Sequence, residues 1–106
     1  MYKLFLDDAR YPAERDHDAI IMRTCEEAID YVRANGMPHT VLLDHDLGYG
    51  VATGYDFVKF LVDYCIENEI DPNAISFCVH SMNPVGARNM KQLWYGFMKH
   101  WETSNQ

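Results

Sequence analysis

The 106-residue sequence lacks any apolar run approaching the roughly 20 residues of a membrane span, and its N-terminus lacks the pattern of a signal peptide. It also lacks a Cys-x-x-Cys pair, since Cys25, Cys65 and Cys78 are far apart and lie in apolar company. An odd number of separated cysteines disfavours a disulfide framework and a zinc site. Because Met1 leads directly into a strand-like segment, we expect a cytoplasmic protein with reduced thiols.

Basic residues are also scarce. Nine Lys and Arg stand against sixteen Asp and Glu, which gives a net charge of −7. Non-specific affinity for duplex nucleic acid depends on Lys and Arg that neutralise phosphates, so we expect neither duplex nucleic acid nor a membrane as a partner. A small phosphorylated ligand or nucleotide is still compatible with this net charge if a metal ion or a local arginine supplies positive charge.

The chain shows no internal repeat, linker or low-complexity segment. A hydrophobic content of 48% argues against disorder, and the length suits one core. We therefore predict a single domain over residues 1–101, followed by a polar tail at 102–106.

Periodicity divides this domain into alternating elements. Short apolar segments predict strands at 2–6, 19–22, 40–43 and 75–79, and apolar stripes at helical spacing predict helices near 25–35, 54–68 and 85–101. Residues 9–18 show no helical periodicity and predict an unusually long loop. Strands that alternate with helices predict an α/β fold with a mostly parallel sheet and right-handed crossovers.

Acidic residues follow two of the predicted strands. Asp7 and Asp8 end the first, while Asp44 and Asp46 follow the third. The carboxyl ends of parallel strands meet at one sheet edge, and carboxylates gathered there need a cation because like charges raise one another's pKa. Hard oxygen ligands suit Mg²⁺, Ca²⁺ or Mn²⁺, and the pattern favours such a cation held by these four residues. The alternative is that the aspartates only cap loops and helix starts.

Histidines close two strands at the same edge and could exchange protons at neutral pH. His45 could instead be oriented by the acids beside it, and His80 could bond a backbone carbonyl in a turn. Arg10 could hold a phosphate, or form a salt bridge with Asp8 or Glu14.

Ser81 and Asn83 follow the fourth strand, just before the last predicted helix. The free N–H groups at the start of that helix could hold an anion. Asn83 also fits an ordinary N-cap, and both interpretations can hold together.

The segment Leu-x-Leu-Asp-Asp at 4–8, the strand that ends in Asp44, and Ser81 resemble a response-regulator receiver domain. The resemblance implies that Asp7 and Asp8 bind Mg²⁺, that Asp44 accepts a phosphoryl group and that Ser81 supplies a hydroxyl.

A fuller resemblance is to a divergent branch, the cyclic-phosphate processing receiver-like domain (cREC) of bacteria and their phages. Four blocks carry it, in consistent order and spacing: LFLDDARYP, LLDHDLG, TGYD and HSMNPVGARNM. It implies a truncated receiver-like (flavodoxin-like) three-layer sandwich of about four mainly parallel strands and three helices. It also implies that His45, His80 and Asn83 lie in the active site beside the aspartates.

Two departures from ordinary receivers bear on function. A loop replaces the helix between the first two strands, and no strand follows the last helix, so the lysine of the receivers' fifth strand has no counterpart. These departures disfavour a signalling switch, and the added histidines favour chemistry on a ligand.

Three functions follow as hypotheses. The first is divalent-metal-dependent hydrolysis of a cyclic phosphate on a nucleotide or nucleotide-derived molecule. The second is a phosphoacceptor modified on Asp44. The third is a non-catalytic module that binds a nucleotide or a host protein. In the first, His45, His80 and Asp44 are catalytic, Arg10, Ser81 and Asn83 bind the substrate, and Asp7, Asp8, Asp44 and Asp46 hold Mg²⁺ or Mn²⁺.

Overall fold

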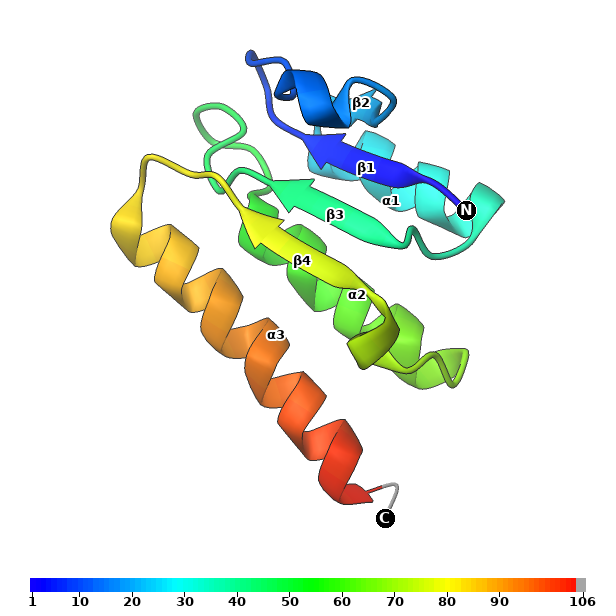
Figure 1. Ribbon diagram of the computed structural model, residues 1–106. Coiled ribbons are helices and arrows are strands. Elements are labelled where there is room, and N and C mark those ends of the chain that lie inside the picture. The colour runs from blue at the N-terminus through cyan, green and yellow to red at the C-terminus, as the bar shows by residue number, and fades with distance from the viewer. Residues whose placement is uncertain (105–106) are drawn as a thin grey trace.

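The computed structural model describes residues 1–104 and contains one parallel sheet with the strand order β2-β1-β3-β4 (Figure 1). Its strands are β1 (Lys3–Leu6), β2 (Ile20–Met22), β3 (Thr40–Leu43) and β4 (Ser76–Val79). Its helices are α1 (Cys25–Asn35), α2 (Gly54–Glu67) and α3 (Pro84–Ser104), with short 3-10 helices η1 (Glu14–Asp16) and η2 (Pro72–Ala74). The predicted α/β class is confirmed.

Two boundaries differ from the sequence-based expectation. Helix α3 continues to Ser104, so residues 102–104 of the expected polar tail are helical, and the last two lie outside the described residues. The predicted loop at 9–18 contains the short helix η1. Helices α1 and α2 are each capped by a threonine, because the side chains of Thr24 and Thr53 accept hydrogen bonds from backbone N–H groups of the first turn.

The core lies between the sheet and the helices. Val41 on β3 pairs with Leu4 on β1 and with Phe77 on β4, and this row faces the helices. Alternate strand residues point to the same face, so the next such row again contributes apolar side chains to this core. Fully buried residues from α2 and α3, among them Phe57, Leu61, Met90 and Trp94, pack against it.

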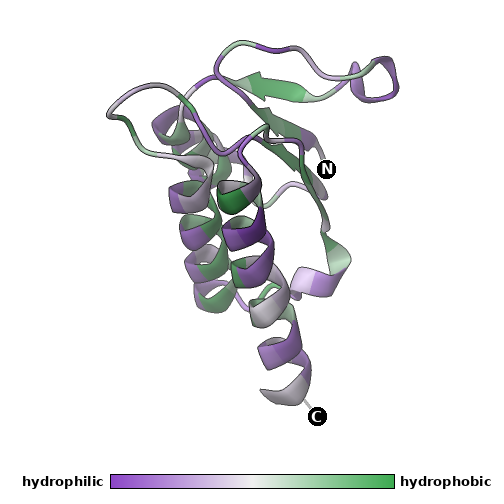
Figure 2. Cartoon of the chain, turned by 90° about the vertical axis from the view of Figure 1, so that its left-hand side faces the viewer, coloured by the Kyte–Doolittle hydropathy of each residue, from purple (hydrophilic) through white to green (hydrophobic). Residues whose placement is uncertain are grey.

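The sheet is covered by helices on one face only within residues 1–104, as the side view in Figure 2 shows. The predicted three-layer sandwich is therefore wrong in its number of layers. The path from β2 to β3 to β4 crosses the sheet in one direction, so right-handed crossovers place α1 and α2 on the same face. Helix α3 follows β4 and packs beside α2 on that face. The β1–β2 connection runs in the opposite direction, so it crosses the other face. That connection is the segment 9–18, which contains no α-helix.

That segment is fixed above the opposite face, which we call the open face. Lys3 points to the open face, and its Nζ atom lies 3.3 Å from a carboxylate oxygen of Asp16 and 3.3 Å from one of Asp18. The two ion pairs hold η1 over β1. Phe5 and Leu42, which also point to this face, are shielded in part by the same segment.

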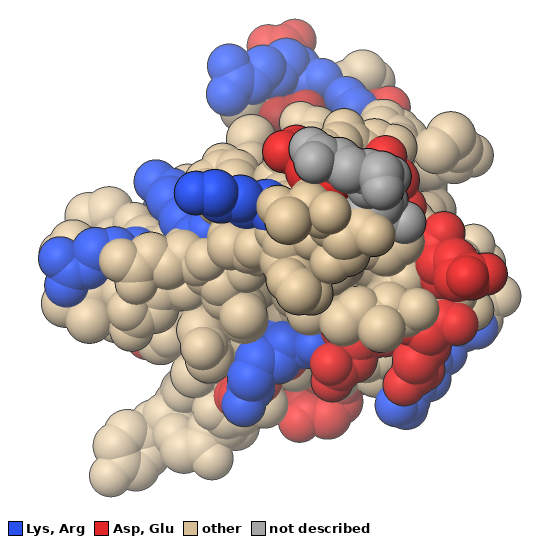
Figure 3. All heavy atoms as spheres, turned by 90° about the horizontal axis from the view of Figure 1, so that it is seen from below, with Lys and Arg blue, Asp and Glu red and all other residues tan. Residues whose placement is uncertain are grey.

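Charge is distributed unevenly over the molecule. Seen from below, acidic side chains gather along one side of the surface, and Lys and Arg side chains lie mostly elsewhere (Figure 3). The net charge of −7 therefore does not describe every part of the surface. In the described part of the chain, no helix has the length and hydropathy needed to cross a membrane.

Candidate active site

Three of the predicted site residues occupy one row across the sheet. Leu6, Leu43 and Val79 are paired neighbours on β1, β3 and β4, so the residues that follow them, Asp7, Asp44 and His80, lie side by side. The row is fixed by backbone hydrogen bonds, since Asp44 N donates to the carbonyl of Leu6 and His80 N to that of Leu43. Because strand side chains alternate, this row belongs to the open face.

Asp7 is the most enclosed member of the row, with 1% of its surface exposed. Its Oδ1 accepts hydrogen bonds from the backbone N–H groups of Ala9 and Arg10, at 3.0 and 2.9 Å. Its Oδ2 accepts from Arg10 Nε at 2.9 Å and lies 3.1 Å from His80 Nε2. Burial raises the pKa of Asp7, but the hydrogen bonds from Arg10, Ala9 and His80, with the charge of Arg10, outweigh it and lower that pKa.

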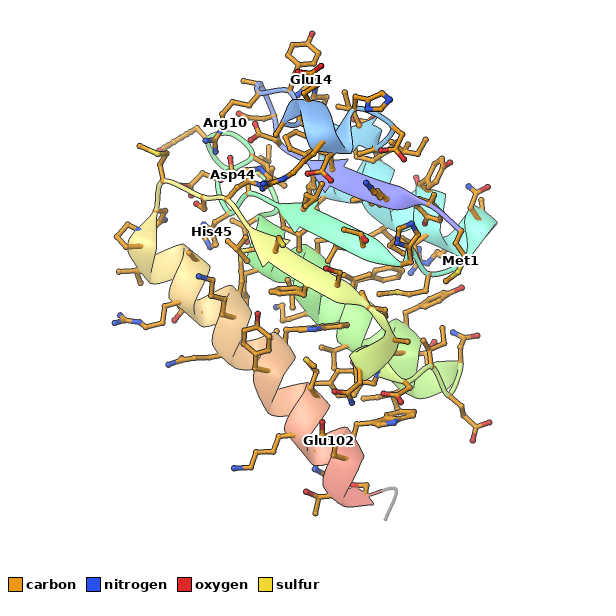
Figure 4. The ribbon with its side chains drawn as sticks, in the orientation of Figure 1. Met1, Arg10, Glu14, Asp44, His45 and Glu102 are labelled. Carbon is orange, nitrogen blue, oxygen red and sulfur yellow. The ribbon has the colours of Figure 1, made fainter. Side chains whose placement is uncertain are left out.

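Arg10 bridges the two buried carboxylates. Besides its contact with Asp7, its Nη2 lies 3.4 Å from Asp44 Oδ2 and donates to the carbonyl of His80 at 3.2 Å. Figure 4 shows Arg10 and Asp44 at the same edge of the sheet. Of the two interpretations of Arg10, the structure places it in a salt bridge, but with Asp7 and Asp44, not with Asp8 or Glu14. Burial lowers its pKa, and the charges of the two aspartates outweigh this and raise it.

Three carboxylates could share a cation. One oxygen from each of Asp7, Asp8 and Asp44 can be chosen so that all lie within 4.8 Å of one another. Asp8 is exposed, whereas the other two are buried. Asp44 keeps its position because its Oδ1 also accepts a hydrogen bond from the backbone N–H of His45, at 2.8 Å. The set offers only oxygen donors, which Mg²⁺ and Mn²⁺ prefer.

Asp46 and His45 lie apart from this group. Asp46 is exposed and does not belong to the group formed by Asp7, Asp8 and Asp44 in the described residues. Its Oδ1 lies 2.9 Å from His45 Nδ1. The His45 ring packs against the first turn of α3 so closely that a Cβ on Gly86 would overlap it. His45 also lines a hollow between α2 and α3 with Thr53, on the helix side of the sheet. The two predicted catalytic histidines therefore lie on different faces.

Ser81 and Asn83 organise the start of α3. Ser81 Oγ accepts a hydrogen bond from Asn83 N at 3.0 Å, and Asn83 Oδ1 accepts from Gly86 N at 3.0 Å. The second contact is the N-cap that the sequence indicates. Asn83 Nδ2 also donates to Asp46 at 3.5 Å. The amide of Asn83 is thus used within the protein, whereas the Ser81 hydroxyl, an acceptor here, keeps its own proton to donate.

A cleft of about 380 Å³ opens beside the row, on the open face. Leu42 and Cys78 form part of its floor, and His80 stands at one end, stacked on Phe5 with ring centroids 4.8 Å apart. The segment Ala9–Asp18 forms its wall, with side chains that include Arg10, Tyr11, Ala13 and Arg15.

Sequence reasoning missed Arg23, which holds this wall in place. Its Nη1 donates to the carbonyl oxygens of Asp7 and Arg10, at 3.0 and 2.6 Å, and its guanidinium lies 4.9 Å from the centroid of the Tyr11 ring. A signal was present, because Arg23 follows β2 directly, just as Asp7 follows β1. Tyr11 and Phe5 carried no comparable signal, since aromatic residues in a loop or strand are common.

Comparisons with known proteins identify one relationship. The family model of the cyclic-phosphate processing receiver domain matches residues 2–96, a range that includes the row, the carboxylate group and the cleft. Searches among curated proteins and among solved structures found no match.

Proposed function

Because the chain belongs to the family of cyclic-phosphate processing receiver domains, we propose that it hydrolyses a cyclic phosphate on a nucleotide or nucleotide-derived substrate with a divalent cation. The observation that carries the proposal is the row of Asp7, Asp44 and His80 beside a cleft on the open face. A positioned proton-transfer group and ligands for a cation are groups that support hydrolysis of a phosphodiester.

Asp7, Asp8 and Asp44 would hold the cation, Mg²⁺ or Mn²⁺. The fit rests on three carboxylate oxygens within 4.8 Å of one another, two of them from buried residues that lose little on being ordered. A bound ion of this kind supplies a polarised phosphoryl oxygen and a water of lowered pKa. Asp46 is left out of this set, because its carboxylate contacts His45 and Asn83.

His80 is the proton-transfer group of the proposal. An ionised carboxylate only accepts hydrogen bonds, so the 3.1 Å contact with Asp7 requires the proton on His80 Nε2. In the neutral ring Nδ1 is then the basic nitrogen. His80 also lines the cleft, where its side chain is 27% exposed. The aspartate orients the imidazole, and a general base must be held in position in this way.

We assign proton transfer to His80 and not to His45. His45 is wedged against Gly86 and lines the hollow on the helix side, so it cannot meet the same phosphate from the cleft. Its backbone N–H, which binds Asp44, is its contribution to the row.

The phosphate would be held by Arg10 and Ser81. The Arg10 side chain is 46% exposed although it contacts both aspartates, so part of the guanidinium remains open to the cleft. A planar guanidinium pairs well with phosphate oxygens. Ser81 follows His80 directly and can donate its hydroxyl proton. Asn83 holds the helix start that positions Ser81.

Turnover of 2′,3′-cyclic nucleotides and cyclic dinucleotides tests the proposal, with Mg²⁺, Mn²⁺ or EDTA and products separated by chromatography. His80→Ala should abolish turnover and keep its far-ultraviolet circular dichroism. His100→Ala, on the exposed surface of α3, is the matched control and should remain fully active. Full activity of His80→Ala removes His80 from the mechanism, and turnover in EDTA removes the cation.

The same carboxylates also suit a phosphoacceptor, because Asp44 lies at the end of β3 beside Asp7 and Asp8. Incubation with acetyl phosphate and Mg²⁺, followed by intact mass, separates this second candidate from the first. A stable phosphoryl adduct that Asp44→Asn abolishes favours the phosphoacceptor. Ligand binding without either turnover or adduct favours a non-catalytic module, whether its target is a nucleotide or a host protein.

A further inference from the structure

The cleft on the open face has the size of a small-molecule site. Its volume of about 380 Å³ lies within the range of roughly 300–1,000 Å³ that ligand pockets occupy. It extends from the row of Asp7, Asp44 and His80 back along the strands. The residues two positions earlier on the same face are Phe5, Leu42 and Cys78, so the floor becomes apolar as it leaves the row.

The chemistry of the cleft divides along its length. His80 and Arg10 stand at the end next to the carboxylates, while Leu42 and Cys78 form the floor beyond and Tyr11 part of the wall. Two residues along a strand span about 6.6 Å. This separation is comparable with the distance that a ribose places between a phosphate on its ring and the attached base.

Two arginines of the wall can contact an anionic ligand. Arg10 and Arg15 line the cleft together with one acidic residue, Asp16, which is itself paired with Lys3 at 3.3 Å and Arg15 at 3.5 Å. Arg10 also compensates Asp7 and Asp44, so the wall offers an anion the exposed part of the Arg10 guanidinium and the exposed Arg15 side chain.

We propose that this cleft is the nucleoside subsite of the substrate: the base lies on Leu42 and Cys78 against Tyr11, and the cyclic phosphate lies against Arg10 and His80. The inference rests on the proposed function and gives the substrate an orientation along the strands. Arg23 is a positioning residue for this subsite, because it binds the carbonyls at both ends of the 7–10 turn and lies against the Tyr11 ring. The wall is thereby built before the ligand arrives.

Cys78 gives a direct binding assay that needs no turnover. Its side chain is exposed on the floor, whereas Cys25 and Cys65 are buried. Burial raises the pKa of these two thiols to about 11 and about 12, so they serve as unreactive internal references at pH 8. Alkylation with iodoacetamide, measured on peptides by mass, reports access to the cleft.

Adenosine 2′,3′-cyclic phosphate should slow alkylation of Cys78 about tenfold when its concentration is ten times Kd, by mass action. Inorganic phosphate should give no protection, because it reaches only the Arg10 end. Equal protection by phosphate would overturn the nucleoside subsite. The experiment is run with EDTA and then with Mg²⁺, so that binding is recorded with and without the cation.

A filled cleft gives the second test. Cys78→Trp places a large ring on the floor and should weaken binding of adenosine 2′,3′-cyclic phosphate, measured by calorimetry, at least about tenfold. Ser76→Trp is the matched control, since Ser76 is exposed on the same strand and face, two residues farther from the row. Its affinity should stay within about twofold of the wild type.

The outcomes separate this inference from the proposed function. Protection of Cys78 and loss of affinity in Cys78→Trp without any hydrolysis support the subsite and contradict the hydrolase. Hydrolysis with an unprotected Cys78 and an unaffected Cys78→Trp overturns the subsite and leaves the hydrolase standing. If none of the nucleotides tested is bound or hydrolysed, both the subsite and the hydrolase are overturned.

Discussion

Replacement of Arg10 by alanine tests whether its guanidinium is the counter-ion of the two buried aspartates. Asp7 is 1% exposed and Asp44 7%, so water cannot replace the guanidinium well. Breaking a fully buried ion pair costs about 3–5 kcal/mol, whereas an exposed pair contributes less than about 1 kcal/mol. Because the Arg10 side chain is 46% exposed, we expect Arg10→Ala to lower the free energy of unfolding by about 2 kcal/mol.

Urea and thermal unfolding in EDTA, followed by circular dichroism, measure this loss. For a domain of about this length, 2 kcal/mol corresponds to a fall in Tm of about 8 °C. Arg15→Ala is the matched control, because Arg15 lies in the same segment, is 87% exposed and reaches Asp16 only at 3.5 Å. It should change the free energy of unfolding by less than about 0.5 kcal/mol.

The same variants report on the cation site. A divalent ion and the Arg10 guanidinium compensate the same carboxylates, so Mg²⁺ should raise the Tm of Arg10→Ala more than that of the wild type. Equal Tm values for Arg10→Ala and Arg15→Ala would show that the aspartates do not depend on the guanidinium. Equal responses of Arg10→Ala and the wild type to Mg²⁺ would show that the ion does not share these carboxylates.

Three further changes have outcomes that follow from single contacts. A Cβ on Gly54 would overlap the backbone oxygen of Asp44. Gly54→Ala should therefore lower the free energy of unfolding by about 1–3 kcal/mol in urea and reduce turnover. An unchanged urea midpoint would contradict that contact. Thr53 and Asp56 form the capping box of α2, so Thr53→Ala should cost about 1 kcal/mol, and a loss below a few tenths would discount the cap. The folded-state pKa of Asp7 lies below its ordinary value of 3.8, so its contribution is present above that pH and is lost as the pH falls through the lower value. The free energy of unfolding, measured in urea from pH 7 to pH 3, should therefore fall less in Asp7→Asn than in the wild type. Parallel plots of this free energy against pH for the two proteins would refute the lowered pKa.

Local signals predicted most of the fold. The alternation of strands and helices was enough to predict a parallel sheet, and the apolar stripe near 25–35 predicted α1 (Cys25–Asn35). The number of layers was wrong because the resemblance to receivers supplied it. In the order β2-β1-β3-β4 the β1–β2 connection is the one that crosses to the second face, and residues 9–18 form no α-helix there. The loop was predicted from the sequence, but its effect on the layers depends on the strand order, which no local pattern expresses.

The candidate site was predicted in part, and the reason lies in the strand register. Asp7, Asp44 and His80 follow three neighbouring strands, so their meeting follows once the sheet is parallel. His45 is one residue beyond Asp44, and alternation sends its side chain to the helix face. To predict that His45 and His80 lie on different faces, one must know how the residues of β3 pair with those of β4, and the sequence does not show this pairing. Arg23 acts through contacts with backbone carbonyls, and such contacts leave no periodic trace in the sequence.

The missing layer changes the direction from which a reactant can arrive. In a sandwich with helices on both faces, the strand ends can be reached only end-on, through the loops above them, which suits a compact phosphodonor. Here the face without α-helices would admit a molecule lengthwise along the strands, beside residues 9–18, with its reactive end at the aspartates. An elongated reactant can thus be held along its whole length, and selectivity can be set by groups remote from the bond that breaks.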